Sequence, residues 1–410
     1  MTAAAPSHVH LVDDDAILVS SLAEGLRALG HRVTTGPTGA PGLALLHELR
    51  PDLLVVDLMM PGMDGATFVR HARADAALAG LRIVVLSAKV YDTDRRAALA
   101  AGADAFALKP ARLPALAALF QSLLHPEVDV GFWGVRGTLP VNGPATLRYG
   151  GDTSCVCLRF PEGQTIVLDA GSGVRPLGQH LARQGRLDCT LLFTHPHWDH
   201  LNALPFFAPL FVPGNHVEIA GPPQGPHDVR ALVAAQMDGV FFPITPREFA
   251  ADVHYRDLAP GPFTVQGVAA DAFTLMHPGT CFGYRFTHRG RSLAYVTDNE
   301  LFDPGLPGWA ADYEGALADW LRGVDLLITD TTWSTADEYR PRVGWGHSTV
   351  AQVARLCVAA GVRRLALFHH DPSQSDDDID RKHDLARDAV ARLGGATEVL
   401  CPAQGASLRV

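Results

Sequence analysis

Three histidines and an aspartate fall within the six residues 195–200, which follow Thr194 and the apolar residues 191–193. The four side chains are those of His195, His197, Asp199 and His200. A buried strand that ends in such a cluster delivers several ligands to one point at the edge of a sheet. Imidazole and carboxylate together suit zinc, manganese or iron better than a hard cation such as calcium. This segment therefore predicts a metal site.

Other apolar runs in the last two-thirds of the chain also end in a histidine or an aspartate. The runs and the residues that follow them are 165–168 with Asp169, 273–276 with His277, 293–297 with Asp298, and 365–368 with His369. Any one of these residues could be a core histidine or a helix cap. Together they favour convergence of all these side chains on one edge of a sheet.

The stretch 344–349, Gly-Trp-Gly-His-Ser-Thr, has the composition of a phosphate-binding turn before a helix. We expect Ser348 and Thr349 to offer hydroxyl and backbone N–H groups to a phosphate. His347 could protonate the departing oxygen as a general acid. The alternative is an ordinary N-cap Ser or Thr preceded by a surface histidine.

The first third of the chain carries a second set of reactive residues, again at predicted strand ends. Asp13, Asp14 and Asp57 could hold a magnesium ion through carboxylate oxygens and waters. Asp57 could also act as a nucleophile toward a phosphoryl group, which Ser87 and Lys109 would then contact.

The elements that position this second set alternate along the chain. Predicted strands cover residues 8–12, 32–35, 53–56, 83–86 and 105–108, and helical patterns cover 17–29, 43–49, 66–78, 95–101 and 113–124. Five βα units of this length predict a doubly wound, five-stranded parallel sheet with its site at the carboxyl ends of the strands.

The pattern of predicted secondary structure changes after a short linker that contains Pro126. We expect one domain at residues 7–124, a linker at 125–129, and a second domain of short strands and Gly/Pro-rich turns at 130–410. The segment 1–6 has no signal-peptide pattern, and no apolar run is long enough to span a membrane. The six cysteines include no CxxC pair. These features predict a cytoplasmic protein with reduced thiols.

The net charge of −10 is concentrated in the second domain. Residues 1–125 hold 11 Lys and Arg against 12 Asp and Glu, and the remainder holds 23 against 32. Nucleic-acid binding depends on basic surface, so this balance argues against a long nucleic-acid partner.

Residues 8–124 resemble a response-regulator receiver domain of the CheY type, through LVDDD at 11–15, VVDLMMPGMDG at 55–65, LSA at 86–88 and ALKP at 107–110. The resemblance implies that Asp57 is the phospho-acceptor and that Asp13 and Asp14 help to hold Mg²⁺. It also implies that Ser87 and Phe106 form a switch pair and that Lys109 contacts the phosphoryl group. The expected partner is a histidine kinase or phosphotransfer protein.

Residues 130–410 resemble the metallo-β-lactamase fold, an αββα sandwich, through Asp169, HxHxDH at 195–200, His277, Asp298 and His369. The resemblance implies two divalent ions, one held by His195, His197 and His277 and the other by Asp199, His200 and His369. Asp298 would bridge them, Asp199 would also take part in catalysis, and Asp169 would orient a ligand. His369 is preferred over His370 because it directly follows the strand.

The motifs FWGVRGTLP, RYGGDTSC, GHST and LFHHDP are similar to those of tRNase Z and the cyclic-phosphate phosphodiesterases. The chain lacks the basic, glycine-rich arm that long tRNase Z enzymes use, which favours a small nucleotide or cyclic phosphodiester as substrate. A receiver-regulated phosphodiesterase is therefore predicted, with a second copy of the chain in a homodimer among its candidate partners. A tRNase Z-like ribonuclease, a thioester or lactone hydrolase, a di-iron redox site and a non-catalytic output domain remain alternatives.

Overall fold

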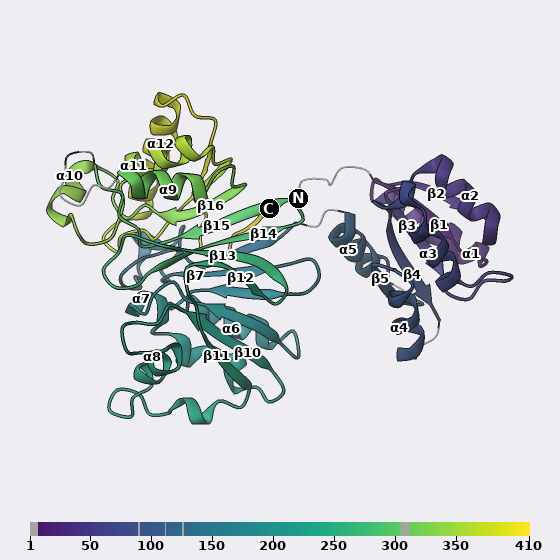
Figure 1. Ribbon diagram of the computed structural model, residues 1–410, viewed down its shortest axis with the longest axis horizontal. Helices are drawn as coiled ribbons and strands as arrows, with labels where there is room; N and C mark the ends of the chain where they lie inside the picture. The colour runs from purple at the N-terminus through teal and green to yellow at the C-terminus, as the bar shows by residue number, and fades with distance from the viewer. Residues whose placement is uncertain (1–6, 89–90, 111, 125–126, 304, 306–310) are drawn as a thin grey trace. The chain divides into compact units, whose positions relative to one another are not determined.

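The computed structural model describes residues 7–88, 91–110, 112–124, 127–303, 305 and 311–410. The chain divides into two compact units at residue 126 (Figure 1). Residues 125 and 126 of the predicted linker lie outside the described residues, and the first strand of the second unit begins at Asp129.

The first unit alternates strands and helices, as the sequence predicts. Its strands are β1 His8–Val12, β2 Arg32–Gly36, β3 Leu53–Asp57, β4 Arg82–Ser87 and β5 Ala105–Leu108. Its helices are α1 Ala16–Ala28, α2 Gly39–Leu49, α3 Gly65–Ala74, α4 Asp92–Ala100 and α5 Leu113–Leu124. The strands form one parallel sheet in the order β2-β1-β3-β4-β5, which confirms the doubly wound fold.

Alternation along these strands sends apolar side chains to both faces of the sheet. Leu54 and Val56 pack in the core under α2, α3 and α4, whereas Val55 and Val84 pack in the core under α1 and α5. A parallel sheet covered by helices on both faces explains why the strands β3 and β4 are nearly continuous apolar runs.

The second unit contains two seven-stranded sheets. The first has the order β11-β10-β9-β8-β7-β6-β19 and the second the order β12-β13-β14-β15-β16-β17-β18. The strands of the first sheet are β6 Asp129–Gly134, β7 Cys155–Arg159, β8 Thr165–Leu168, β9 Asp188–Leu192, β10 His216–Gly221, β11 Asp252–Asp257 and β19 Ser407–Arg409. Those of the second are β12 Gly261–Val265, β13 Val268–Thr274, β14 Phe282–His288, β15 Arg291–Val296, β16 Leu326–Asp330, β17 Arg364–Phe368 and β18 Glu398–Leu400.

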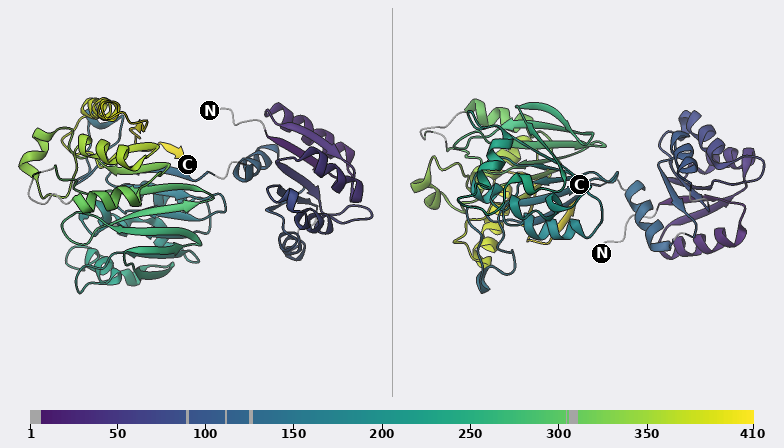
Figure 2. Two further views of the ribbon diagram at one scale, coloured as in Figure 1. Left: turned by 45° about the horizontal axis from the view of Figure 1, so that its top comes forward. Right: turned by 90° about the horizontal axis from the view of Figure 1, so that it is seen from below.

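Helices cover the outer face of each sheet (Figures 1 and 2). The helices on the first sheet are α6 Val174–Ala182, α7 Trp198–Leu201 and α8 Val229–Gln236. Those on the second are α9 Ala311–Trp320, α10 Ala336–Tyr339, α11 Val350–Ala360 and α12 Asp376–Arg392. One core fills the space between the sheets, with Phe132, Tyr284 and Phe368 among its buried rings, and two further cores lie under the helices. This four-layer arrangement confirms the predicted αββα sandwich.

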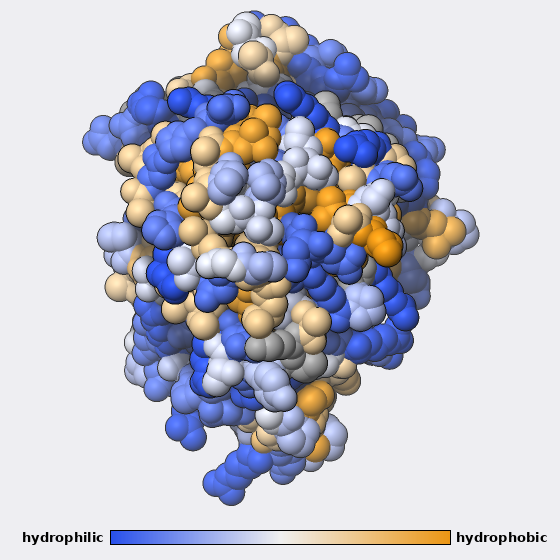
Figure 3. All heavy atoms as spheres, turned by 90° about the vertical axis from the view of Figure 1, so that its right-hand side faces the viewer, coloured by the Kyte–Doolittle hydropathy of each residue, from blue (hydrophilic) through white to orange (hydrophobic). Residues whose placement is uncertain are grey.

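The surface is mixed in polarity. On the face drawn in Figure 3, hydrophobic residues are interspersed among hydrophilic ones, which is usual because apolar atoms supply much of any protein surface. Among the described residues, none of the helices combines the length and the apolar character that a membrane span requires.

Candidate metal centre

The carboxylate of Asp298 lies between two groups of histidines at the carboxyl ends of the strands. Its Oδ2 atom is 3.6 Å from His195 Nε2 and 3.8 Å from His277 Nε2. Its Oδ1 atom is 3.2 Å from His200 Nε2 and 3.1 Å from His369 Nε2. One carboxylate therefore presents a separate oxygen to each of two ligand sets.

The remaining predicted ligands complete these two sets. His197 Nδ1 lies 3.1 Å from His277 Nε2, which places it with His195 in the first set. Asp199 Oδ2 lies 3.2 Å from His200 Nε2 and 3.0 Å from His369 Nε2, which places it in the second. The structure thus brings together all seven residues that the sequence analysis assigned to the dinuclear site.

Hydrogen bonds fix the orientation of the histidine rings. His200 Nδ1 donates to Asp169 Oδ2 over 2.8 Å, and His277 Nδ1 donates to the carbonyl oxygen of Gly346 over 3.2 Å. His369 Nδ1 lies 3.0 Å from the hydroxyl of Thr332. In each case the Nε2 atom is left facing the centre, as expected for histidines that bind metal.

Asp169 contacts the side of His200 that faces away from the centre. Its carboxylate also accepts hydrogen bonds from the backbone N–H of Thr194 over 2.7 Å and from the Tyr295 hydroxyl over 2.8 Å. Since both oxygens are engaged by the protein, Asp169 holds the segment that begins at Thr194 in place and orients His200. This is the orienting position that the sequence analysis assigned to it.

Three residues of the site have left-handed backbone conformations. Asp169, Asp298 and His369 have φ angles of 59°, 56° and 57°. Left-handed conformations are unfavourable for residues other than glycine, and they concentrate at functional sites where the surrounding structure enforces them. Each residue stands directly after a strand or one position beyond it, so the turn redirects its side chain toward the centre.

Burial and charge give the two ligand sets different electrostatic character. Burial lowers the pKa of His195 well below its usual value and that of His277 to about 4, so both rings are neutral with a lone pair available. Burial also opposes a charge on His200, yet the carboxylates of Asp199, Asp298 and Asp169 raise its pKa well above the usual value. Three buried carboxylates around one imidazole make a strongly negative site that a cation would neutralise.

The donor set fits a metal on a further observation. His195 Nε2 is buried and has no hydrogen-bond partner, although it faces Asp298. A buried polar nitrogen without a partner is costly, so it points to a ligand at this position. Mixed imidazole and carboxylate donors are those that zinc, manganese or iron accept.

His347 lies beside the centre and has a partner that the sequence analysis missed. Its Nδ1 atom is 2.8 Å from the Oδ2 atom of Asp330, the last residue of β16, and its ring stacks on that of His369 with centroids 5.0 Å apart. Burial lowers the pKa of His347, but the charge of Asp330 outweighs burial and raises it to about 9. Asp330 is the last residue of an apolar strand, and Asp298 follows another strand closely. The rule that identified Asp298, an aspartate at the end of an apolar run, could therefore also have identified Asp330.

Ser348 and Thr349 make structural contacts. The Ser348 hydroxyl donates to the carbonyl oxygen of Asn299 and accepts from the N–H of Leu301, and the Thr349 side chain caps α11 by accepting from the N–H of Gln352. Both hydroxyls are therefore committed to the backbone, as the N-cap alternative requires. These contacts give no support to the predicted phosphate-binding role of the two side chains.

His370 points away from the centre. It lies 3.3 Å from the buried Lys382 ammonium group and 3.8 Å from Cys401 Sγ, while His369 faces the carboxylates. The geometry thus favours His369 as the ligand. The left-handed backbone conformation at His369 turns the chain, so that the side chains of His369 and His370 point in different directions.

The reactive residues of the first unit also meet at one edge. Lys109 Nζ lies 2.6 Å from Asp57 Oδ1 and 2.7 Å from Asp13 Oδ2, and one ligand oxygen from each of Asp13, Asp14 and Asp57 could contact a single ion. Burial raises the pKa of Asp57, while Lys109 opposes this effect. Ser87 is buried at the end of β4. Phe106 on β5 pairs with Val85, which precedes Ser87 by two residues on β4.

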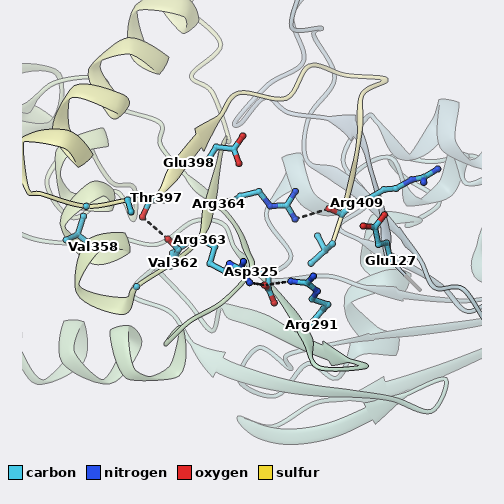
Figure 4. Close-up of a pocket in the computed structure, with 14 residues that line it drawn as sticks. Glu127, Arg291, Asp325, Val358, Val362, Arg363, Arg364, Thr397, Glu398 and Arg409 are labelled. Carbon is cyan, nitrogen blue, oxygen red and sulfur yellow. Dashed lines mark hydrogen bonds and ion pairs between the residues drawn. The ribbon is translucent and has the colours of Figure 1, made fainter. Parts of the chain in front are cut away.

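A pocket of about 640 Å³ in the second unit lies at the opposite ends of the strands from the metal centre (Figure 4). It contains four arginines, Arg291, Arg363, Arg364 and Arg409. The first two contact Asp325, and Arg364 donates to the carbonyl oxygen of Arg409. These contacts within the protein indicate a structural role for at least three of the arginines.

Two protein families match the chain. The response regulator receiver domain family matches residues 9–121, and the beta-lactamase superfamily domain family matches residues 164–370. The transcriptional regulatory protein AfsQ1 of Streptomyces coelicolor is 40% identical over 120 residues, which are 29% of this chain and 52% of that protein. The chain thus spans about half the length of this curated relative.

The chain is also similar to two solved structures. The metallo-beta-lactamase fold protein YhfI from Bacillus subtilis is 17% identical, with a TM-score of 0.49 over 69% of this chain and 100% of that chain. The short form of human tRNase Z is 20% identical, with a TM-score of 0.46 over 68% of this chain and 98% of that chain.

Proposed function

Because the chain belongs to the beta-lactamase superfamily and carries a response regulator receiver domain, we propose that it is a response regulator with a dinuclear metal-dependent phosphodiesterase output. The substrate class that we propose is a nucleotide or cyclic-nucleotide phosphodiester. A histidine kinase or phosphotransfer protein would phosphorylate Asp57, and phosphorylation would change the rate of hydrolysis.

The observation that carries this proposal is the combination of Asp298 with His347. Asp298 presents one oxygen to each ligand set, and the partly buried ring of His347 stacks on that of His369 in the second set. Two divalent ions held by these sets would polarise a phosphoryl oxygen and favour ionisation of the attacking water. Hydrolysis of a phosphodiester also needs a proton for the departing oxygen, and we propose that His347 donates it.

The surrounding residues define what His347 can do. Its Nδ1 atom is engaged by Asp330, so the proton that it gives away is the one on Nε2. Asp330 is itself fixed, because its Oδ1 atom accepts hydrogen bonds from the N–H and the hydroxyl of Thr332. We therefore assign His347 as the general acid and Asp330 as the residue that positions and charges it.

Hydrolysis of bis(p-nitrophenyl) phosphate by protein loaded with Mn²⁺ or Zn²⁺ tests the proposal. We expect metal-dependent activity, and we expect His347→Ala to lower kcat by roughly 10²–10⁴-fold because general acid catalysis is lost. Equal zinc content in the variant and the wild type would show that the metal ligands are intact.

Absence of activity in folded, metal-replete protein would contradict the phosphodiesterase assignment and favour the thioester or lactone hydrolase. Activity that His347→Ala leaves unchanged would retain phosphodiester hydrolysis but remove His347 from the mechanism. Cyclic and linear dinucleotides would be the next substrates to compare, since the unit's surplus of acidic residues disfavours long nucleic acids.

A further inference from the structure

A second cluster of metal-binding side chains lies at the other end of the first sheet. His216 is the first residue of β10, and Asp252 and His254 are the first and third residues of the neighbouring strand β11. His216 Nε2 lies 3.1 Å from Asp252 Oδ2, and His254 Nε2 lies 3.2 Å from Asp252 Oδ1. Two imidazoles from different strands thus converge on one carboxylate.

The register of the sheet makes this convergence a fixed feature of the fold. His216 pairs with Asp252 across the two parallel strands, and Asp252 and His254 share a face because strand side chains alternate. The two imidazole rings are nearly parallel, with centroids 5.3 Å apart and an interplanar angle of 13°. The ligand atoms are therefore held together by the backbone before any ion arrives.

The separations between these atoms suit a transition-metal ion. Zinc binds histidine nitrogen and carboxylate oxygen at about 2.0–2.2 Å, so neighbouring ligand atoms in a tetrahedral site are roughly 3.4 Å apart. The observed nitrogen-to-oxygen distances of 3.1 and 3.2 Å are close to this value, and one atom from each residue lies within 4.8 Å of the others. Small side-chain rotations would centre an ion between them.

The surroundings keep the cluster accessible and negative. The side chains of His216, Asp252 and His254 are 46%, 60% and 62% exposed. Asp188 on β9 pairs with His216 from the other side and adds a second carboxylate to this face. Glu218, the next residue of β10 on the face, is engaged by the Thr190 hydroxyl and lies 3.9 Å from Arg256.

This cluster is separate from the dinuclear centre. His195 follows the carboxyl end of β9, whereas His216 and Asp252 stand at the amino ends of β10 and β11, which run parallel to β9. At about 3.3 Å per residue, the length of these strands separates the two clusters by roughly 15–20 Å. In Figure 1, β10 and β11 are labelled side by side in the part of the second unit farthest from α10 and α12.

We propose that His216, Asp252 and His254 form a mononuclear site for zinc or a neighbouring divalent ion such as Ni²⁺ or Cu²⁺. Two imidazoles and a carboxylate are the donors that these ions prefer. The bound ion links β10 to the edge strand β11, and water fills its remaining coordination positions. The site stabilises the edge of the sheet and takes no part in hydrolysis.

The alternative is a charged edge without metal, because strands at the edge of a sheet often carry charges that prevent pairing with other chains. Zinc content distinguishes the two. The full-length protein is stripped with chelator, dialysed against a fixed micromolar concentration of free zinc, and analysed for zinc per chain. His216→Gln and His254→Gln are compared with the wild type, and His180→Gln serves as a control at an exposed histidine outside the cluster.

We expect each cluster variant to bind one zinc ion fewer than the wild type, with unchanged hydrolytic activity, and the control to match the wild type. We also expect zinc to raise the unfolding temperature of the wild type more than that of His254→Gln, because the ion binds only the folded edge. Equal zinc content in wild type and both cluster variants would overturn the proposal and leave a charged edge. This outcome is independent of whether the dinuclear centre is a phosphodiesterase.

Discussion

Single side chains decide the chemistry of the metal centre, and Asp330 is the one with the clearest testable role. Its Oδ2 atom contacts His347 Nδ1, and its Oδ1 atom accepts a hydrogen bond from the hydroxyl of Thr332, which also contacts His369 Nδ1. Replacing its charge leaves the metal ligands in place while removing the group that sets the orientation and the basicity of His347.

We expect Asp330→Asn to lower kcat for bis(p-nitrophenyl) phosphate by roughly 10–100-fold with little change in KM, since a transition-state interaction is weakened. In the His347→Ala background the same change should have a much smaller effect, because residues that act as a unit are not additive. Asp337→Asn on α10, an exposed carboxylate, is the matched control. Equal effects of Asp330→Asn in both backgrounds would show that Asp330 does not act through His347.

A buried histidine in the first unit makes its stability depend on pH. His10 on β1 is fully buried, and burial lowers its pKa to about 4. Its Nδ1 atom lies 2.9 Å from the Thr34 hydroxyl, and its Nε2 atom has no hydrogen-bond partner. Between pH 6.5 and 4 the unfolded chain binds a proton at this residue that the folded unit excludes, so stability falls as the pH decreases.

We expect this effect to weaken the first unit by up to about 1 kcal/mol between pH 7 and pH 5.5. Hydrogen exchange of peptides from β1 and β3 in the full-length protein measures it. The protection of these peptides should decrease less with acid in His10→Gln than in the wild type. The same decrease in both proteins would assign the pH dependence to other groups.

At the scale of elements, strand ends explain both what the sequence predicts and what it misses. All five strands of the first unit are predicted to within one residue at either end. The signal is clearest for β3 and β4, which are buried and mainly apolar. In the second unit the predicted strand that leads to His277 extends to residue 276, whereas β13 ends at Thr274. Leu275 and Met276 are apolar and continue the hydrophobic pattern, although the backbone has already left the sheet. The sequence pattern alone therefore cannot show where the strand ends.

The ligand residues are predictable because imidazoles and carboxylates directly after strands have few structural uses. Their orienting partners are harder to predict. Tyr295 and Thr332 contact the site through hydroxyls, and Gly346 contacts His277 through a carbonyl oxygen, so no reactive side chain marks them in the sequence. The sequence leaves phosphate binding and helix capping both open for Ser348 and Thr349, because a hydroxyl that binds phosphate and one that binds backbone look alike in sequence.

Asp325 joins three strands of the second sheet at their amino ends (Figure 4). Its Oδ1 atom lies 3.2 Å from Arg291 and 2.9 Å from Arg363, and its Oδ2 atom accepts from the N–H of Ser292 over 2.9 Å. Burial raises the pKa of Asp325, but the backbone hydrogen bond and the arginines outweigh burial and lower it.

We expect Asp325→Asn to lower the free energy of unfolding by about 1–3 kcal/mol, because charge-assisted hydrogen bonds are lost near the surface. The folded-state pKa lies below the unfolded one, so the carboxylate stabilises the fold above the unfolded pKa of 3.8 and loses its effect as the pH falls through the lowered folded value. The difference between variant and wild type in urea unfolding should therefore shrink in acid. A difference that is constant with pH would exclude the charge as its origin.

At the scale of the whole chain, two complete sites stand in two separately folded units. The first unit holds a buried Asp57 with Lys109 beside it, and the second holds the two ligand sets that meet at Asp298. Phosphorylation of Asp57 would add negative charge next to Lys109 and near the Ser87 hydroxyl, and Phe106 on the adjacent strand would move with it. This change would alter the first unit without altering any of the ligand residues around Asp298 in the second unit.

We therefore expect a small phosphodonor such as acetyl phosphate to change kcat of the wild-type protein severalfold and to leave Asp57→Asn unchanged. Asp64→Asn, which removes the charge of the α3 N-cap residue in the same unit while keeping an oxygen that can cap the helix, controls for loss of a carboxylate elsewhere. An equal response of wild type and Asp57→Asn would assign the effect to the donor itself. No response in wild-type protein that mass spectrometry shows to be phosphorylated would mean that the receiver regulates something other than turnover, because a two-state unit can alter only the property for which its two states differ.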